Sequence, residues 1–293
     1  MIPAEPPCTL VRSSGDVSVA VHDLGGPTGR TVPVLLFSHA TGLHGRVWEP
    51  MASHLTEHFR CLAIDYRGHG LSDTPSGTVM DWAAFGDDAV AVLDSELIGP
   101  EQVVHGVAHS MGGAALVLAA SRRPARFRSL WLYEPVIVPP GGLLVEDGPN
   151  PMAEAAERRK EYFGSFEEAV ANFASKPPLN ELDPAALRSY VAGGFARQPD
   201  GSVRLRCRPA TEAAVFYGAV GSHAWDVLPS LEIPVAVVLG RQESMGPVAF
   251  GLPVVGALPQ GVLVERRSLG HFGPLEDPAS LARDVADWVD AHR

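Results

Sequence analysis

The sequence predicts an α/β fold in which a doubly wound, mostly parallel sheet carries an inserted helical cap. Short apolar runs alternate with amphipathic helical patterns along most of the chain, as in folds built from parallel strands and covering helices. This alternation stops between about residues 139 and 225, where only helical patterns remain. The chain has 293 residues, 46% of them hydrophobic, which is enough for one such core with an insertion.

Six apolar runs are predicted to be the strands of the sheet. They are rich in Val, Leu and Ile and apolar throughout, so they fit a sheet that helices cover on both faces. They span residues 32–38, 61–65, 103–107, 130–133, 235–239 and 262–265. Helical spacing of apolar residues predicts a helix from Trp82 to Val92, and Asp277-Pro278 is a favourable start for a C-terminal helix. We assign residues 1–138 and 226–293 to this core.

The remaining segment, residues 139–225, is predicted to be a purely helical cap over the sheet. Pro139-Pro140-Gly141-Gly142 precedes it as a natural hinge. Ser165-Phe166-Glu167-Glu168 is a capping-box pattern, and Asp183-Pro184 begins a second helix.

The composition excludes several classes of partner. Asp and Glu number 34 against 23 Lys and Arg, a formal net charge of -11. Such a surface repels phosphate backbones and anionic lipids, so we expect neither nucleic acid nor a membrane as a partner. The three scattered cysteines have no metal-type spacing, and the N-terminus lacks the features of a signal peptide. We therefore expect a cytoplasmic protein that needs no metal or cofactor and takes a small molecule.

The third predicted strand runs directly into Ala108-His109-Ser110-Met111-Gly112, where a helical pattern begins. A serine hydroxyl is a weak nucleophile and must project from a sharp strand-to-helix turn to reach a substrate. Side chains two residues before and after the serine would collide there, so small residues are needed at both positions. The following helix directs its positive N-terminus at the serine. Ser110 is therefore the candidate nucleophile.

Two further segments supply partners for such a serine. The first predicted strand ends in a small-residue loop, His39-Ala40-Thr41-Gly42, in which the Thr41 amide, or alternatively that of Leu43, can bind an oxyanion together with the Met111 amide. A Gly-rich loop places His271 between the last strand and the last helix, so this histidine is the candidate general base. The polar turn from Asp65 to Gly70 is interpreted as scaffolding, because no further ligand spacing supports a metal site.

This ordered set of motifs resembles the α/β-hydrolase superfamily over essentially the whole chain. It is similar to the capped branch that includes esterases, lactonases and carbon–carbon bond hydrolases. Two positions depart from the usual pattern: Ala108 replaces the first glycine around the nucleophile, and Ala40 stands where the loop often has glycine. The resemblance implies a Ser–His–acid triad and no cofactor.

The acid of this triad has two candidates. The usual family position follows the strand after the cap, which points to Glu243. Some members, such as the fungal zearalenone lactonases, take the acid from the end of the strand after the nucleophile, which corresponds to Glu134 here. Both positions keep the order serine, acid, histidine, and the short strand end at Glu134 favours that residue.

The resemblance predicts hydrolysis of a moderately sized hydrophobic ester or lactone through an acyl-enzyme. The alternatives are a carbon–carbon bond hydrolase acting on a diketone, and a ligand-binding protein on the same fold. Five residues are candidate substrate contacts because they flank the motifs or enrich the cap in aromatic side chains: His109, Leu43, Phe195, Phe216 and Trp225.

Overall fold

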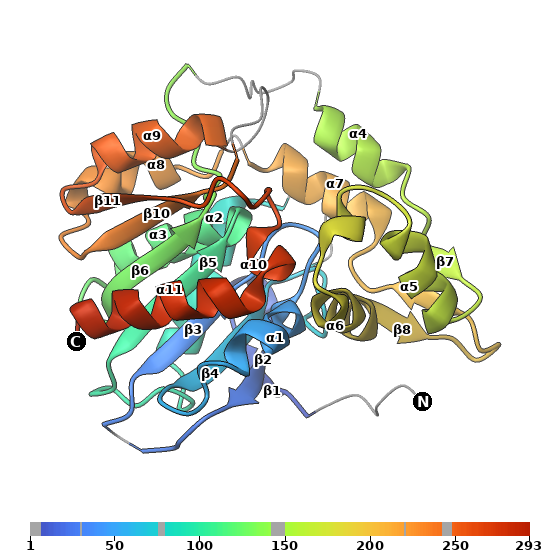
Figure 1. Cartoon of the computed structure of the whole chain (residues 1–293), viewed down its shortest axis with the longest axis horizontal. Coiled ribbons are helices and arrows are strands. Elements are labelled where there is room, and N and C mark those ends of the chain that lie inside the picture. Colours follow the sequence, from blue (N-terminus) through green and yellow to red (C-terminus); the bar gives the residue numbers. More distant parts are fainter. Residues whose placement is uncertain (1–6, 30, 76–79, 142–149, 220, 242–247) are drawn as a thin grey trace.

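The computed structural model describes residues 7–29, 31–75, 80–141, 150–219, 221–241 and 248–293. The main sheet has eight strands in the order β1-β2-β4-β3-β5-β6-β10-β11 (Figure 1). From β3 onward the strands of this sheet run parallel, and β1 and β2 form an antiparallel hairpin at one edge. The strands are β1 Thr9–Arg12, β2 Ser18–Gly25, β3 Val34–Ser38, β4 Arg60–Asp65, β5 Val104–His109, β6 Phe127–Tyr133, β10 Val235–Leu239 and β11 Gly261–Glu265. The predicted α/β fold class is confirmed.

Helices cover both faces of the sheet. On one face, α2 and α3 pack with α8 and α9 against alternate strand residues such as Leu36 and Leu130. On the other face, α1 and α11 cover the intervening residues, such as Phe37 and Trp131. This division follows from the two-residue repeat of a strand. The core helices are α1 Glu49–Ala52, α2 Trp82–Leu93, α3 Met111–Arg122, α8 Ala224–Val227, α9 Val248–Ala257, α10 Gly273–Glu276 and α11 Pro278–Ala291, with short 3-10 turns at Ser14–Asp16, Gly45–Trp48 and Leu228–Ser230.

Residues 151–217, within the insertion between β6 and β10, pack beside the core, on the right in Figure 1. Its helices are α4 Pro151–Glu157, α5 Phe166–Ala174, α6 Pro184–Gly194 and α7 Pro209–Tyr217, with a 3-10 turn at Leu179–Glu181. Ser165 caps α5 by accepting a hydrogen bond from the Glu168 amide at 3.0 Å, and Asp183 caps α6. The boundaries of the cap at residues 139 and 225 stay a prediction.

The expectation of a purely helical insertion was wrong. The segment also contains a three-stranded antiparallel sheet of β7 Tyr162–Phe163, β8 Phe195–Arg197 and β9 Val203–Leu205. A tight turn at Pro199-Asp200-Gly201 joins β8 to β9, with Gly201 at a φ of +87°. This Pro-Asp-Gly sequence is a recognisable turn signal, but strands of two or three residues are too short to show a periodicity.

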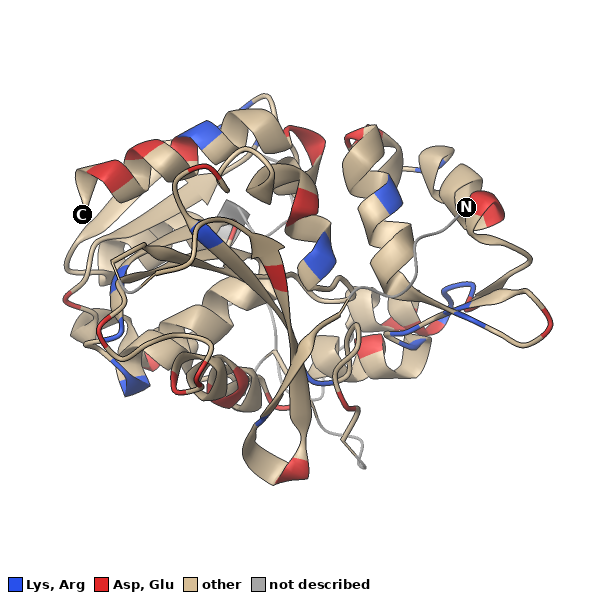
Figure 2. Cartoon of the chain, turned by 90° about the horizontal axis from the view of Figure 1, so that it is seen from below, with Lys and Arg blue, Asp and Glu red and all other residues tan. Residues whose placement is uncertain are grey.

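Two further features of the main sheet differ from the prediction. The hairpin of β1 and β2 was not anticipated, although Val17, Val19 and Val21 alternate with other residues and are buried. At the opposite edge, Val262 and Leu263 of β11 are exposed because this strand has a neighbour on one side alone among the described residues. Of the described helices, none combines the length and apolar character needed to cross a membrane. Figure 2 shows acidic residues on both the core and the cap, with Lys and Arg interspersed.

Candidate active site

The carboxyl ends of the parallel strands meet at one edge of the sheet, beside the cap. The register pairs His109 with Tyr133 and Tyr133 with Val238, so the residues that follow β5 and β6 stand next to each other. These residues are Ser110 and Glu134. Ligands of open α/β sheets bind outside this edge, so it is the expected place for a reactive site.

Ser110 occupies a strained turn between β5 and α3. Its φ of 55° and ψ of -120° lie in a region that residues with a side chain rarely adopt. Neighbouring strand ends stabilise this conformation: the Ser110 amide donates to the Tyr133 carbonyl at 3.0 Å, and the Val136 amide donates to the Ser110 carbonyl at 3.2 Å. The residue is 7% exposed. The strand-to-helix turn required for a projecting nucleophile is therefore present.

Gly112 lets α3 approach β3 closely. A methyl group at this position would lie 2.5 Å from Ser38 Oγ and 2.7 Å from the His39 carbonyl oxygen. The Ser38 hydroxyl lies 2.6 Å from the Tyr66 hydroxyl and 2.9 Å from the Gly112 carbonyl oxygen, to which it donates. The small residue after the serine is thus required by backbone packing, as the sequence pattern predicts.

His271 is held by Glu134. The Nδ1 atom of His271 lies 2.7 Å from Glu134 Oε2, and Glu134 is 1% exposed. The other oxygen of this carboxylate, Oε1, accepts a hydrogen bond from the Gly240 amide at 2.9 Å. A carboxylate can only accept, so the Nδ1 atom of His271 carries the proton in this pair and Nε2 is left with its lone pair.

The loop that carries His271 is fixed from two sides. The Tyr133 hydroxyl donates to the Gly270 carbonyl at 2.7 Å, and the Glu276 carboxylate accepts from the Gly270 amide at 2.8 Å. Gly273 is needed there, because a methyl group on it would lie 2.1 Å from the Tyr133 hydroxyl oxygen. Side chains from β6 and α10 therefore orient the histidine.

Of the two acid candidates, Glu134 lies within the described residues, where it contacts His271. The alternative, Glu243, lies outside the described residues. The position of Glu134 directly after β6 gives it a φ of 41°, a second left-handed residue at this edge of the sheet.

The loop after β3 forms a tight turn. The Leu43 amide donates to the Ala40 carbonyl at 3.1 Å, with Gly42 at a φ of +75°, and the Gly42 amide donates to His69 Nε2 at 3.2 Å. Among the hydrogen bonds between described residues, none uses the Thr41 amide. Of the two candidate donors in this loop, the Leu43 amide is therefore already used within the turn. Met111, the candidate donor on the other side, is the first residue of α3, and its amide has no acceptor within the helix.

Two neutral histidines support this loop. His39 Nε2 accepts from the Tyr66 amide at 3.1 Å, so its Nδ1 carries a proton and donates to the Ala40 carbonyl at 2.8 Å. His69 likewise accepts from Gly42, and its Nδ1 donates to the Arg67 carbonyl at 3.0 Å. Burial lowers the pKa of His39 well below 6.5 and that of His69 to about 4, so both remain neutral at pH 7.

His109 packs behind His271 and is fully buried. The two ring centroids are 4.7 Å apart, and Phe272 and Tyr133 also contact the His109 ring. Neither ring nitrogen makes a hydrogen bond of standard geometry to a described residue. Burial first, and then the neighbouring His271, lower the pKa of His109 well below 6.5.

The cap residues expected at a substrate pocket occupy different places. Phe195 is buried against Phe163 and Phe173, in the same apolar layer as Leu43 of the loop after β3. Phe216 packs on a separate alanine-rich contact between α4 and α7. Trp225 lies against the core layer of α2 and α3. Phe195 and Leu43 thus belong to one large buried cluster, whereas Trp225 and Phe216 pack against two other clusters.

The polar turn after β4 is a structural scaffold in this molecule. Asp65 accepts hydrogen bonds from the Gly45 amide at 2.6 Å and the Leu71 amide at 2.8 Å, and it contacts His22 at 2.9 Å. Gly70 is required because a side chain there would overlap the Asp65 carboxylate. Within the described ranges, no three His, Cys, Asp or Glu side chains are grouped as a metal site requires.

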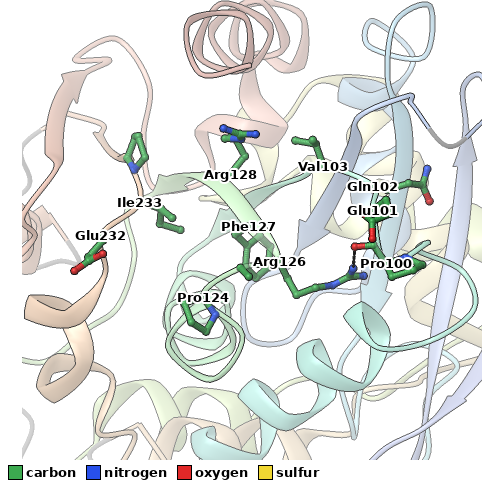
Figure 3. A pocket seen from close by; sticks show the side chains of 12 residues that line it. Pro100, Glu101, Gln102, Val103, Pro124, Arg126, Phe127, Arg128, Glu232 and Ile233 are labelled. Carbon is green, nitrogen blue, oxygen red and sulfur yellow. Dashed lines mark hydrogen bonds between the residues drawn. The ribbon is translucent and has the colours of Figure 1, made fainter.

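A hollow of about 460 Å³ lies at the opposite edge of the sheet and is lined by residues 100–103, 124–128 and 232–234. These residues precede β5 and β10 and precede or begin β6, so the hollow faces the amino ends of the strands, away from Ser110. Figure 3 shows Arg126 turned toward Pro100, whose carbonyl accepts a hydrogen bond from Nη1 at 2.9 Å. Arg126 Nη1 and Nη2 also donate to the carbonyls of Leu93, Ile98 and Gly99. The guanidinium therefore links the start of β6 to the segment between α2 and β5.

The mostly parallel eight-stranded sheet with helices on both faces is the fold of the α/β hydrolases, and the comparisons agree. Residues 33–278 match the family described as "alpha/beta hydrolase fold". The chain belongs to this family.

Proteins similar to this chain include an enol-lactonase and an esterase. The chain is 31% identical over 230 residues to "3-oxoadipate enol-lactonase 1" of Acinetobacter baylyi, covering 78% of this chain and 77% of the relative. It is 25% identical over 273 residues to "Bifunctional esterase/perhydrolase DCH" of Acinetobacter calcoaceticus, covering 89% and 92%. The crystal structure of E-2-(acetamidomethylene)succinate hydrolase shares the fold with a TM-score of 0.74 at 22% identity, covering 97% and 99% of the two chains.

Proposed function

We propose that this protein is a serine hydrolase that cleaves a carboxylic ester or lactone through an acyl-enzyme. The observation that carries the proposal is the 2.7 Å contact of Glu134 with His271 at the edge of the sheet where Ser110 occupies its strained turn. The names of the esterase and enol-lactonase relatives support the substrate class. The aromatic side chains concentrated in the cap favour a hydrophobic substrate of moderate size.

In the first half of the reaction, His271 Nε2 removes the proton of the Ser110 hydroxyl while Oγ attacks the substrate carbonyl carbon. Glu134 keeps the proton on Nδ1 and stabilises the imidazolium that forms. The amides of Thr41 and Met111 bind the oxyanion of the tetrahedral intermediate. His271 then returns the proton to the leaving alkoxide, which departs as the alcohol and leaves an acyl-enzyme.

In the second half, a water molecule attacks the acyl carbon and gives its proton to His271. The bond between Ser110 Oγ and the acyl carbon breaks, the proton returns to the serine, and the carboxylic acid leaves. Each proton taken by the imidazole is returned within the same half-reaction. The two half-reactions therefore balance with the substrate, one water molecule and the side chains of Ser110 and His271.

The test is labelling with a fluorophosphonate probe, followed by turnover of short-chain esters, lactones and a vinylogous diketone. We expect the wild type and Ser121→Ala, a control on the same helix α3, to be labelled, and Ser110→Ala to be unlabelled and inactive. Cleavage of the diketone with little ester turnover would show a carbon–carbon bond hydrolase. A folded wild type that takes up no label but is stabilised thermally by a candidate ligand would show a binding protein.

A further inference from the structure

The cap places two charged side chains directly against the loop that carries Thr41. A methyl group at Gly42, the next residue, would lie 2.6 Å from Glu212 Oε1 and 3.3 Å from Arg159 Nη1. Glu212 lies on α7, and Arg159 follows α4. Glu212 is only 6% exposed. Since a buried charge is tolerated only when it is paired, this contact is a specific arrangement and not a chance surface approach.

The two side chains belong to a continuous set of contacts, here called the circuit, that links Gly42 through the cap to His44 in the same loop. Arg159 Nη1 donates to Glu212 Oε2, and Arg159 Nη2 lies 2.5 Å from the Tyr190 hydroxyl. The carbonyl of Tyr190, on α6, accepts a hydrogen bond from His44 Nε2 at 3.0 Å. His44 lies two residues after Gly42, so the circuit runs from the loop through α7, the segment after α4, and α6, and back to the loop.

The same loop contacts both the core and a further part of the cap. The Gly42 amide donates to His69 Nε2, as described above, and the His44 ring fits against Gly193 of α6, where a methyl group would lie 2.3 Å from His44 Cε1. The turn is thus held between the βα turn at His69 and three elements of the cap. These contacts surround the residues on either side of Gly42, so we expect a shift of the cap elements to displace the turn that carries the Thr41 amide.

We propose that Arg159 and Glu212 are positioning residues for the oxyanion loop, so that the cap supports the chemical step as well as covering the substrate. This inference rests on the proposed function and on the Thr41 amide as oxyanion donor. The guanidinium is planar and donates in fixed directions, so it sets the place of the Glu212 carboxylate more narrowly than an ammonium group would. Its charge is already neutralised by Glu212, which argues against a role in attracting an anionic substrate.

The test compares Arg159→Gln with the matched control Arg204→Gln. Arg204 is a second cap arginine of similar exposure, 27% against 22% for the side chains, and its Nε lies 2.7 Å from Glu161. It lies on β9, outside the circuit around Gly42. Tyr190→Phe is a milder variant, because it removes one contact of Arg159 and keeps the buried ring.

We expect Arg159→Gln to lower kcat for a short-chain ester about 10- to 100-fold with KM within about threefold of the wild type, since loss of a whole oxyanion donor costs about 100- to 1000-fold. The Ki of a trifluoromethyl ketone, whose adduct forms the same oxyanion, should rise in parallel. Tyr190→Phe should lower kcat about three- to tenfold. Arg204→Gln should leave kcat and Ki within about threefold of the wild type, whatever it does to the melting temperature.

The results separate this inference from the proposed function. A wild type that is neither labelled by the fluorophosphonate nor active on esters would refute the proposed function itself. An active wild type together with Arg159→Gln and Tyr190→Phe variants that keep wild-type kcat and Ki would refute the positioning role alone. If Arg159→Gln does not fold, an unchanged Ki in the folded Tyr190→Phe variant also overturns the inference.

Discussion

The assignment of Glu134 as the triad acid gives the sharpest prediction, through Glu134→Gln. This substitution preserves the size of the side chain and removes one acceptor. The wild-type carboxylate accepts from two donors, the Gly240 amide at 2.9 Å and His271 Nδ1 at 2.7 Å. A glutamine has one acceptor oxygen and a donating NH2 group, so it can satisfy only one of these donors and opposes the other.

The size of the effect follows from what the carboxylate does. Without it, His271 loses both the correct tautomer and the partner of its imidazolium, which in a Ser–His–Asp triad costs about 10⁴-fold in kcat. We expect kcat to fall about 10³- to 10⁴-fold, or about 4 to 5.5 kcal/mol of transition-state stabilisation. The unpaired buried donor should also lower the free energy of unfolding by about 1 to 3 kcal/mol. Ester kinetics and urea denaturation measure the two effects separately.

Glu243→Gln is the matched control, because Glu243 is the other acid that the sequence offers. We expect this variant to keep kcat within about threefold of the wild type. The reasoning is refuted if Glu134→Gln stays within tenfold of wild-type kcat while Glu243→Gln loses about a thousandfold. Glu134→Asp should fall between the two glutamine variants, since a side chain one methylene shorter cannot reach both Gly240 and His271.

Two further predictions concern stability. Gly112→Ala should lower the free energy of unfolding by about 1 to 3 kcal/mol and slow acylation, because its methyl group would lie 2.7 Å from the His39 carbonyl oxygen; wild-type values in both assays would contradict the packing argument. Acid should also destabilise the protein, because burial lowers the pKa of His69 and His105 to about 4, below the 6.5 of the unfolded chain. The unfolded chain then binds more protons between pH 4 and 6.5. Above about pH 6.5 the two histidines therefore do not reduce the free energy of unfolding, and by pH 5 each lowers it by about 2 kcal/mol. In urea denaturation at pH 7.5 and 5, His105→Asn should reduce the loss by about that amount, and an equal loss in both proteins would contradict the assignment.

The local parts of the site could be predicted because their requirements are local. A strand that runs into a serine needs small residues on either side of it, and these are visible in sequence as Ala108 and Gly112. A histidine in a Gly-rich loop after the last strand is equally visible. The six parallel strands were predicted within a few residues, because strands buried on both faces are apolar throughout.

The sequence could not anticipate the arrangement of the cap. Arg159 and Glu212 are 53 residues apart, and nothing in either neighbourhood indicates that they meet at Gly42. The strands β7, β8 and β9 were missed because they contain only two or three residues each. Contacts of this kind depend on how helices pack over a loop, and packing leaves no periodic signal.

The sequence by itself determined the α/β fold, the order of the motifs and the candidates Ser110 and His271, because strand burial and a strained turn restrict residue types locally. Only the tertiary structure decided which described carboxylate contacts His271. Glu134 and Glu243 both follow strands and both keep the chain order, so no local rule separates them. The parallel register sets Tyr133 beside Val238, which puts the Glu134 carboxylate between the Gly240 amide and the imidazole. That placement depends on hydrogen bonds between strands more than a hundred residues apart, which a linear pattern does not encode.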